Sequence, residues 1–329
     1  MNKKNIYVII KIFIFVGLIF LGLYLHENRV YHYQKSALIM DTLVDIQIGI
    51  KDDNGMKIIS KTFDLMQEYD DLLDYHDEES ELSILNSKTE SKMFPELYEM
   101  LKIGKKLYNE SAFRYDLSIG KLSDLWENEN IPSKEEIFSA KEFTGFDKIK
   151  FDSKTINKPE ELKLNLGSIA KGFIIDKAIE YLIENGVESA IVNAGGDIRI
   201  FGYDNKIAVG VQHPRAENEI IAKLNVGNVA LVTSGDYERY FIKDGIRYNH
   251  IIDATTGYPA NENISVSVIA KNATLADAYA TTFFVMPAEK ALELANKTDD
   301  VDLYLVKMEN DELKTFKSNG MEKYLTKEF

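Results

Sequence analysis

Asp277 and Thr281 stand four residues apart in the segment 276–282, whose alanines favour a helix. At that spacing the two side chains project from the same helix face, one turn apart. A carboxylate and a hydroxyl among small neighbours suit part of a magnesium site, whose other ligands would be water, a carbonyl and a substrate phosphate. Because Asp is more commonly a helix N-cap or a surface residue, this segment alone leaves both interpretations open.

Two glycine-containing segments could lie close to a phosphate. Residues 164–173 run from an apolar strand through small residues into a helix, and Lys171 adds a mobile positive charge there. Backbone N–H groups at such a turn can bind an anion. Residues 193–197 place two glycines at a strand end, which permits positive φ or a close ligand. A tight turn and a hairpin would explain the same residues.

A histidine and a carboxylate occur together near the end of another predicted strand. His250, one of five histidines, is followed by Asp253 within the segment 248–259, and the polar segment 233–237 precedes them. Strand ends and the loops after them often display catalytic groups. A single histidine is nevertheless more often structural than catalytic.

In their order along the chain, these segments resemble the ApbE family of FAD:protein FMN transferases. The family succession of a Met-Gly-Thr strand, a Ser-Glu-Leu-Ser loop, an Ala-Lys-Gly turn, an Asn-Ala-Gly-Gly-Asp turn, a Thr-Ser-Gly-Asp-Tyr strand, a His-Ile-Ile-Asp loop and an Ala-Asp helix is matched between Met40 and Pro287. This sequence departs from it at Asp41, where the family usually has Gly, at Asn165, where Asp is usual, and at His76, where an aromatic residue is frequent.

The resemblance implies an Mg²⁺-dependent enzyme that moves FMN from FAD to a threonine of an exported flavoprotein subunit and releases AMP. The metal ligands would be Asp277, Thr281 and the main-chain oxygen of Ser168. His250 would be the general base, and Asp253 would be the alternative base or would orient His250. The implied FAD contacts are Met40, His76, Arg114, Tyr115, Asp116, Asn165, Lys171 and Ile252.

Two other functions use the same residues. If water replaces the threonine, the protein is an FAD pyrophosphatase that yields FMN and AMP. If no reaction takes place, it is an extracytoplasmic FAD-binding protein that stores or senses the dinucleotide. Release of AMP in proportion to labelled acceptor would distinguish the transferase from both.

The elements that must position these residues predict an α+β fold. The resemblance implies that this fold is an ApbE-like mixed sheet with packed helices. A strand over 40–48 opens the folded domain, helices follow over 56–73 and 95–108, and an acid-rich loop over 74–83 separates them. Strands are predicted at 188–193, 197–202, 207–212, 228–233, 248–253 and 263–270, and helices near 168–184, 274–285 and 287–297.

An apolar run at the start of the chain predicts a membrane anchor. Residues 6–25 are apolar except for Lys11, a length that can cross the hydrocarbon layer. Lys3 and Lys4 precede this run, so we expect residues 1–5 in the cytoplasm and the single-pass chain outside it. Residues 26–38 would form a tether, and 39–329 the flavin transferase domain. A cleaved signal peptide is the alternative, although small residues are missing after Leu25.

Composition excludes several classes of function. The net charge of −14 argues against nucleic acid as a partner, since phosphate backbones repel such a surface. The chain has no cysteine, which removes disulfides, thiolate nucleophiles and Cys-ligated metal centres. With 329 residues and 45% hydrophobic residues, it can bury one large core or two closely packed ones.

Overall fold

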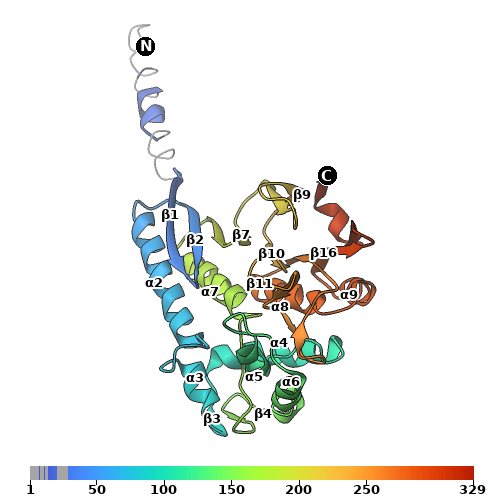
Figure 1. Cartoon of the computed structure of the whole chain (residues 1–329). Helices are drawn as coiled ribbons and strands as arrows, with labels where there is room; N and C mark the ends of the chain where they lie inside the picture. The colour runs from blue at the N-terminus through green and yellow to red at the C-terminus, as the bar shows by residue number, and fades with distance from the viewer. Residues whose placement is uncertain (1–6, 8–10, 12–13, 21–28) are drawn as a thin grey trace.

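The computed structural model describes residues 7, 11, 14–20 and 29–329 (Figure 1). Residues 14–20 are helical and exposed. The remainder of the segment 6–25 that we expect to be an anchor lies outside the described residues, and so do residues 1–5 and 26–28. Within the described residues, no helix is both long and apolar enough to cross a membrane.

A large antiparallel sheet forms the centre of the molecule. Its strand order is β1-β2-β6-β7-β10-β15-β16-β17. Every strand pair in the described part of the chain is antiparallel. The α+β class is confirmed, and the sheet that we expected to be mixed has antiparallel pairs throughout its described strands. The strands are β1 Tyr31–Ile39, β2 Thr42–Ile50, β6 Ser189–Ala194, β7 Asp197–Phe201, β10 Ala230–Gly235, β15 Ser265–Ala270, β16 Val301–Glu309 and β17 Glu312–Lys317.

Helices cover one face of this sheet and enclose the main core (Figure 1). Helix α2 packs on β1 and β2, α7 on β6 and β7, and α8 on β10 and β15. The amphipathic spacing of α2 and the predominantly apolar sequence of α8 fit these positions. The helices are α2 Gly55–Leu73, α3 Glu81–Asn86, α4 Pro95–Glu110, α5 Gly120–Leu125, α6 Lys134–Lys141, α7 Ala170–Glu184, α8 Ala273–Phe284 and α9 Ala288–Ala295.

A second core lies on the other face of the large sheet, under the smaller sheet β18-β9-β8. Neighbouring strand residues alternate between the two cores: Val268 belongs to the main core, whereas Ile269 belongs to the second. Each fully buried aliphatic side chain contributes about 1.5–3 kcal/mol, so both faces stabilise the sheet. The strands are β8 Ile207–Gln212, β9 Ile220–Val226 and β18 Leu325–Glu328, and η2 is Met321–Lys323.

Three smaller sheets complete the described fold. One consists of β3 Glu90–Lys92, β5 Thr155–Asn157 and β4 Lys150–Phe151, next to the short helix η1 Phe146–Lys148. The other two are the hairpins β11 Tyr240–Lys243 with β12 Ile246–Asn249, and β13 Ile252–Asp253 with β14 Tyr258–Pro259. Our prediction of a single strand over 248–253 is therefore wrong, because the chain is not extended as a strand at His250 and Ile251.

The start of the domain also differs from the prediction. Residues 31–38, expected as part of a tether, form β1 together with Ile39, and β1 pairs with β2 along its whole length. Their apolar residues alternate, and Tyr33 and Ala37 pack on the main core. Met40 and Asp41, expected in a strand, form the hairpin turn with φ of 56° and 54°. Such a two-residue turn requires positive φ at both positions, which favours Gly and tolerates Asp.

Candidate active site

Helix α8 carries the predicted metal side chains on one face, as the i, i+4 spacing requires. Asn272 caps its N-terminus and accepts a hydrogen bond from the Leu275 N–H (3.0 Å). The Asp176 carboxylate of α7 accepts hydrogen bonds from the N–H groups of Ala273 and Thr274, both at 2.8 Å. Asp277 is therefore not the cap, and it is buried. The interpretation of this residue as an N-cap or a surface carboxylate is wrong.

The Asp277 carboxylate lies where α8 meets the start of α7. Its Oδ2 accepts a hydrogen bond from the Gly172 N–H at 2.9 Å. A Cβ at Gly172 would come within 2.3 Å of the Ala273 carbonyl oxygen, so only glycine allows this approach of the two helices. Burial, and then the nearby charge of Asp197, raise the pKa of Asp277 to about 7. A bound cation would favour the ionised carboxylate.

Lys171 and Asp197 form an ion pair beside Asp277. Lys171 Nζ lies 2.6 Å from the buried Oδ2 of Asp197, and the Thr233 N–H donates to the other oxygen at 3.3 Å. Although burial alone would lower the pKa of Lys171, attraction to Asp197 and Asp277 raises it. Lys171 therefore remains an ammonium at neutral pH and supplies a positive charge next to the Asp277 carboxylate.

Thr281 and Ser168, the other two predicted metal ligands, lie on different elements and have different partners. Thr281 Oγ1 lies 3.5 Å from the Ser234 hydroxyl at the end of β10. The Ser168 hydroxyl, just before α7, donates to the Tyr115 hydroxyl at 3.0 Å. Burial raises the pKa of Tyr115, whose phenol stays neutral and feels the charge of Asp277.

The donor set fits a hard cation such as Mg²⁺ only in part. A carboxylate, a hydroxyl and a carbonyl are oxygen ligands of the kind that Mg²⁺ prefers. Asp277 is buried, and among the described residues it forms no ion pair, which suits a further ligand. Within the described residues, however, no group of three or more His, Asp or Glu side chains is placed to hold a metal. The remaining ligands would have to be waters and substrate phosphates.

His250 is arranged as an acceptor of a proton. Its Nδ1 lies 3.1 Å from the Arg239 carbonyl oxygen. Because a carbonyl only accepts hydrogen bonds, Nδ1 carries the proton and Nε2 is left with a free lone pair. The protein around the ring, and then the charges of Arg239 and Lys171, lower the pKa of His250. The residue keeps an exposed face, so water offsets part of this effect.

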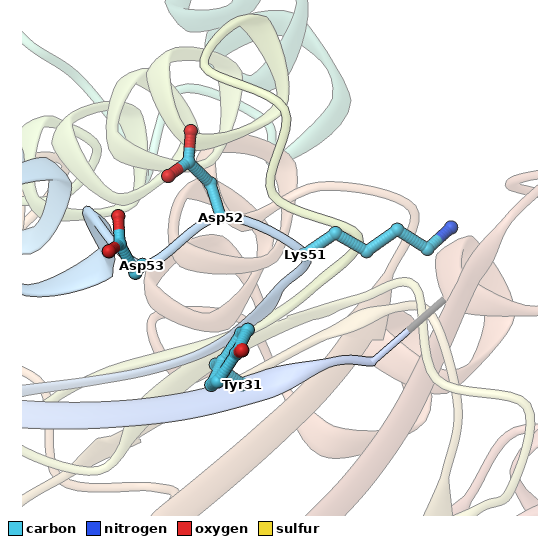
Figure 2. Close-up of a pocket in the computed structure, with 4 residues that line it drawn as sticks. All are labelled: Tyr31, Lys51, Asp52 and Asp53. Atoms are coloured by element: carbon cyan, nitrogen blue, oxygen red, sulfur yellow. The ribbon is translucent and has the colours of Figure 1, made fainter. Parts of the chain in front are cut away.

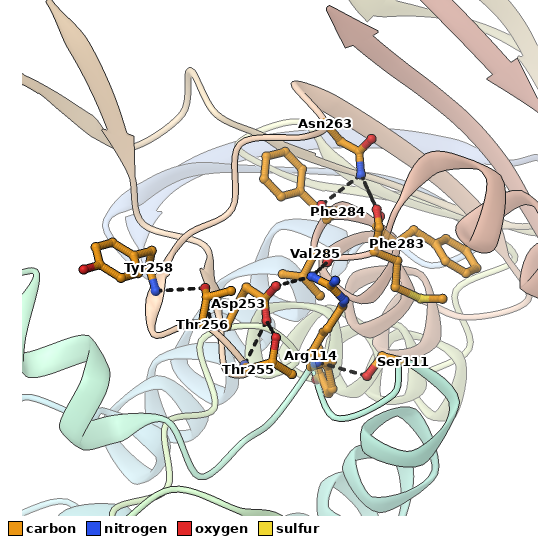
Figure 3. Close-up of polar contacts among 12 residues, drawn as sticks. Ser111, Arg114, Asp253, Thr255, Thr256, Tyr258, Asn263, Phe283, Phe284 and Val285 are labelled. Carbon is orange, nitrogen blue, oxygen red and sulfur yellow. Dashed lines mark hydrogen bonds and ion pairs between the residues drawn. The ribbon is translucent and has the colours of Figure 1, made fainter. Parts of the chain in front are cut away.

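Asp253 does not orient His250, which corrects that part of the sequence interpretation. Figure 3 shows its carboxylate between Arg114, with which it forms an ion pair, and Thr255. The N–H and hydroxyl of Thr255 donate to Asp253 Oδ1 at 2.8 and 2.6 Å. Arg114 Nη1 also lies 3.5 Å from the Val285 carbonyl, at the end of α8. These contacts join the loop after His250 to α8.

Three predicted FAD contacts have structural partners inside the protein. Asp116 is buried and accepts hydrogen bonds from the N–H groups of Ser118 (2.8 Å) and Phe146 (3.2 Å). Burial raises the pKa of Asp116 to about 6. Asn165 Oδ1 accepts from the Gly167 N–H at 2.9 Å, which shapes the turn before Ser168. The Ile252 side chain packs in a small apolar cluster, so only its main chain is available to a ligand.

Met40 and His76 lie on elements next to α2. The Met40 N–H donates to Asp70 Oδ2 at 3.0 Å, which holds the β1–β2 turn against this helix. His76 follows the end of α2 and is exposed, and its Nδ1 lies 3.8 Å from a Glu127 oxygen. Its ring meets Tyr75 edge to face at 5.2 Å. No contact between either residue and Asp277 is among those formed by the described residues.

The hollow drawn in Figure 2 is not part of this site. Tyr31, Lys51, Asp52 and Asp53 line it. Tyr31 pairs with Ile50 at the end of the β1–β2 hairpin opposite to the turn at Met40. A nine-residue strand spans about 30 Å, so the hollow is remote from that turn. It contains none of the predicted site residues.

Comparison with known proteins identifies the family of this chain. The family model described as "ApbE family" matches residues 40–305. The chain belongs to the ApbE family. An FAD:protein FMN transferase of Vibrio cholerae serotype O1 is 31% identical over 278 residues, which cover 80% of this chain and 83% of the relative. One of Klebsiella pneumoniae is 31% identical over 300 residues, which cover 87% of this chain and 92% of the relative.

Solved structures of ApbE proteins share the fold. The crystal structure of the ApbE protein of Thermotoga maritima superposes with a TM-score of 0.82 at 30% identity, and the match covers 90% of this chain and all of that one. The flavin transferase ApbE of Vibrio cholerae gives a TM-score of 0.80 at 27% identity over the same shares. The described domain therefore has an ApbE-like α+β fold.

Two acidic residues of this ApbE domain were missed as site residues. Asp197 ends the Asn-Ala-Gly-Gly-Asp segment, which was interpreted through its glycines alone, although it holds Lys171. Asp176 follows the Ala-Lys-Gly turn by one helical turn and fixes the start of α8. A polar residue within a predicted buried helix was the available signal for Asp176.

Proposed function

We propose that this enzyme transfers FMN from FAD to an acceptor protein, the activity for which its curated relatives are named. The observation that carries the proposal is the contact of the Asp277 carboxylate on α8 with Gly172 at the start of α7, beside the ion pair of Lys171 with Asp197. A buried carboxylate, a lysine that stays protonated at neutral pH and a turn of small residues together are suited to binding a diphosphate with a divalent cation.

In this proposal Mg²⁺ would be held by the Asp277 carboxylate, the Thr281 hydroxyl and the Ser168 main-chain oxygen. Bound there, the ion would neutralise charge on the phosphate oxygens and on the departing AMP. Lys171, fixed by Asp197, adds a second positive charge that is already in place before the reaction. The buried Tyr115 restrains Ser168 through their hydrogen bond.

His250 acts on the acceptor in this proposal. As the threonine oxygen bonds to the FMN phosphorus, the bond from that phosphorus to the AMP oxygen breaks. The proton of the threonine hydroxyl passes to Nε2 of His250. This nitrogen is free because Nδ1 faces the Arg239 carbonyl, and it is unprotonated at neutral pH because the pKa of His250 is lowered. Asp253 keeps the following loop in place through Arg114 and Thr255.

The experiment is incubation of the enzyme with FAD, Mg²⁺ and a flavin-free exported flavoprotein subunit. Flavin fluorescence on the denatured subunit, with one AMP released per labelled chain and FMN located on threonine by mass spectrometry, is the expected result. Free FMN without labelled protein would instead identify a pyrophosphatase. FAD binding without AMP would identify a storage protein. Asp277→Asn is the matched control, which should abolish labelling.

We further propose that residues 6–25 anchor the enzyme in the cell membrane, with the domain on the extracytoplasmic side. The support is the apolar run itself and the lysines before it. The absence of cysteine is compatible with an oxidising compartment. Protease added to intact spheroplasts should remove the domain from the membrane fraction. Full protection of the domain until lysis would contradict this orientation.

A further inference from the structure

The hairpin formed by β11 and β12 is attached to the domain by one of its faces. These two strands pair with each other and, among the described strands, with no other. The rings of Phe241 and Tyr248 stack at 5.1 Å, and Tyr248 stacks on Trp126 at 5.6 Å. The indole N–H of Trp126 donates to the Gly257 carbonyl at 2.9 Å. The hairpin is thus fixed to the loop that follows His250.

The rest of the hairpin presents apolar side chains to solvent. Tyr240 is 46% exposed, Ile242 61% and Ile246 56%. Tyr240 and Ile242 alternate with the anchored Phe241 and therefore share the outer face, whereas Ile246 pairs with Lys243 next to the turn, on the same face as Phe241. Together the three expose apolar surface on both faces of the hairpin, and we call them the apolar patch; a small, separate hairpin does not need such surface for its own packing.

The position of this patch relates it to the proposed reaction. β12 ends at Asn249 and His250 follows directly, while the Arg239 carbonyl just before β11 holds the His250 ring. A hydroxyl that gives its proton to Nε2 must therefore be carried by a chain that passes beside the hairpin. Both outer strand edges are unpaired among the described residues, so an extended segment could add to one of them.

The hairpin also differs in charge from the whole chain. Residues 239–249 contain Arg239, Lys243 and Arg247 against the single acid Asp244, whereas the net charge of the chain is −14. Arg247 pairs with Asp236 at 3.2 Å, but Arg239 and Lys243 form no ion pair in the described part of the chain. An acidic partner segment would be attracted here and repelled by most of the remaining surface.

We propose that the β11–β12 hairpin is the docking surface for the acceptor protein, and that it binds an extended, acidic segment that carries the acceptor hydroxyl. Tyr240, Ile242 and Ile246 supply apolar contact, and Lys243 supplies charge. This proposal rests on the transferase function proposed above, and it assigns recognition of the partner to residues that hold neither FAD nor metal.

The test measures steady-state FMN transfer to a flavin-free bacterial respiratory subunit that carries FMN on threonine when mature. The variants are Ile242→Asp/Ile246→Asp and Lys243→Glu, and the matched control is Met308→Asp, an apolar residue 37% exposed on the β16–β17 hairpin. We expect the double variant to raise the acceptor KM at least about tenfold with kcat unchanged, because uniform binding is lost. FAD affinity, measured by flavin fluorescence, should not change.

The outcomes separate this proposal from the function on which it rests. If the wild type labels no acceptor, both fail. If the wild type labels the subunit and the hairpin variants keep its KM, or if Met308→Asp raises KM equally, the docking assignment alone is overturned. Light scattering that shows a dimer of this chain lost in the double variant would assign the patch to self-association instead. A raised KM for Lys243→Glu that disappears at high salt would support the acidic segment.

Discussion

Replacing Asp277 with Asn removes a buried negative charge and nearly preserves the shape of the side chain. The Asn carbonyl can still accept the Gly172 N–H, which lies 2.9 Å from the native carboxylate. What disappears is the charge that we propose for the metal, and with it the repulsion from Asp197. The variant should therefore lose FMN transfer and, without metal, gain stability.

The pKa of Asp277 gives the sign and size of this gain. It is raised from 3.8 to about 7 in the folded state, first by burial and then by Asp197. Between these values the folded state holds a proton that the unfolded state has released, so this carboxyl lowers stability as pH rises. One pKa unit corresponds to about 1.4 kcal/mol, so the full effect above pH 7 is on the order of 4 kcal/mol. Below pH 4 the effect disappears.

Thermal unfolding from pH 4 to pH 8, without metal, measures this prediction. Asp277→Asn should melt several degrees above the wild type at pH 8 and at the same temperature at pH 4. With FAD and Mg²⁺ present, the wild type should gain stability and the variant should not. Thr281→Val serves as the control that removes a proposed ligand without a charge, and it should show no pH-dependent gain. A variant that is less stable at pH 8, or that still transfers FMN, would refute the reasoning.

Three further substitutions test the roles of single contacts. His250→Gln should slow FMN transfer about 10²–10⁴-fold. In the wild type the rate should fall as the pH drops through the lowered pKa of His250, and in the variant this fall should be absent. Transfer rates measured from pH 4 to 8 check this. Arg114→Met should cost about 3–5 kcal/mol in urea unfolding because it leaves Asp253 buried without its cation, and adding Asp253→Asn should restore part of that loss. Gly172→Ala should lower the free energy of unfolding by about 1–3 kcal/mol, and with it the melting temperature, because the new Cβ would meet the Ala273 carbonyl oxygen. Gly227→Ala should leave the melting temperature unchanged, because the space around Gly227 is open.

Local sequence patterns predicted the elements whose residues interact with near neighbours. The alanine-rich segment predicted α8 over 274–285, and the structure has it at Ala273–Phe284. The shared face of Asp277 and Thr281 follows from helix geometry alone. The helices predicted at 56–73 and 95–108 were also confirmed. Their apolar residues recur at helical spacing, and this local pattern is sufficient to predict a helix with one face on a core.

Contacts between distant parts of the chain could not be predicted from such patterns. The ion pair of Arg114 with Asp253 joins residues 139 positions apart, and Lys171 with Asp197 joins a helix to a strand. Neither pair has a local spacing that indicates it. β1 was missed because it is an edge strand with many exposed residues, so its alternation is weak. The turn at Met40 was missed because Met rarely adopts positive φ.

The separation of His250 from Asp253 follows from backbone geometry that the sequence already contained. In an extended chain, residues three positions apart point to opposite faces, so a strand over 248–253 cannot bring the two side chains together. The structure bends at 250–251, yet keeps the side chains on different partners, Arg239 for His250 and Arg114 for Asp253. The imidazole thus retains an open face for an incoming hydroxyl, while the carboxylate holds the loop to the end of α8. Loss of Asp253 should therefore disturb the placement of the loop, whereas loss of His250 removes a proton acceptor from an otherwise intact framework.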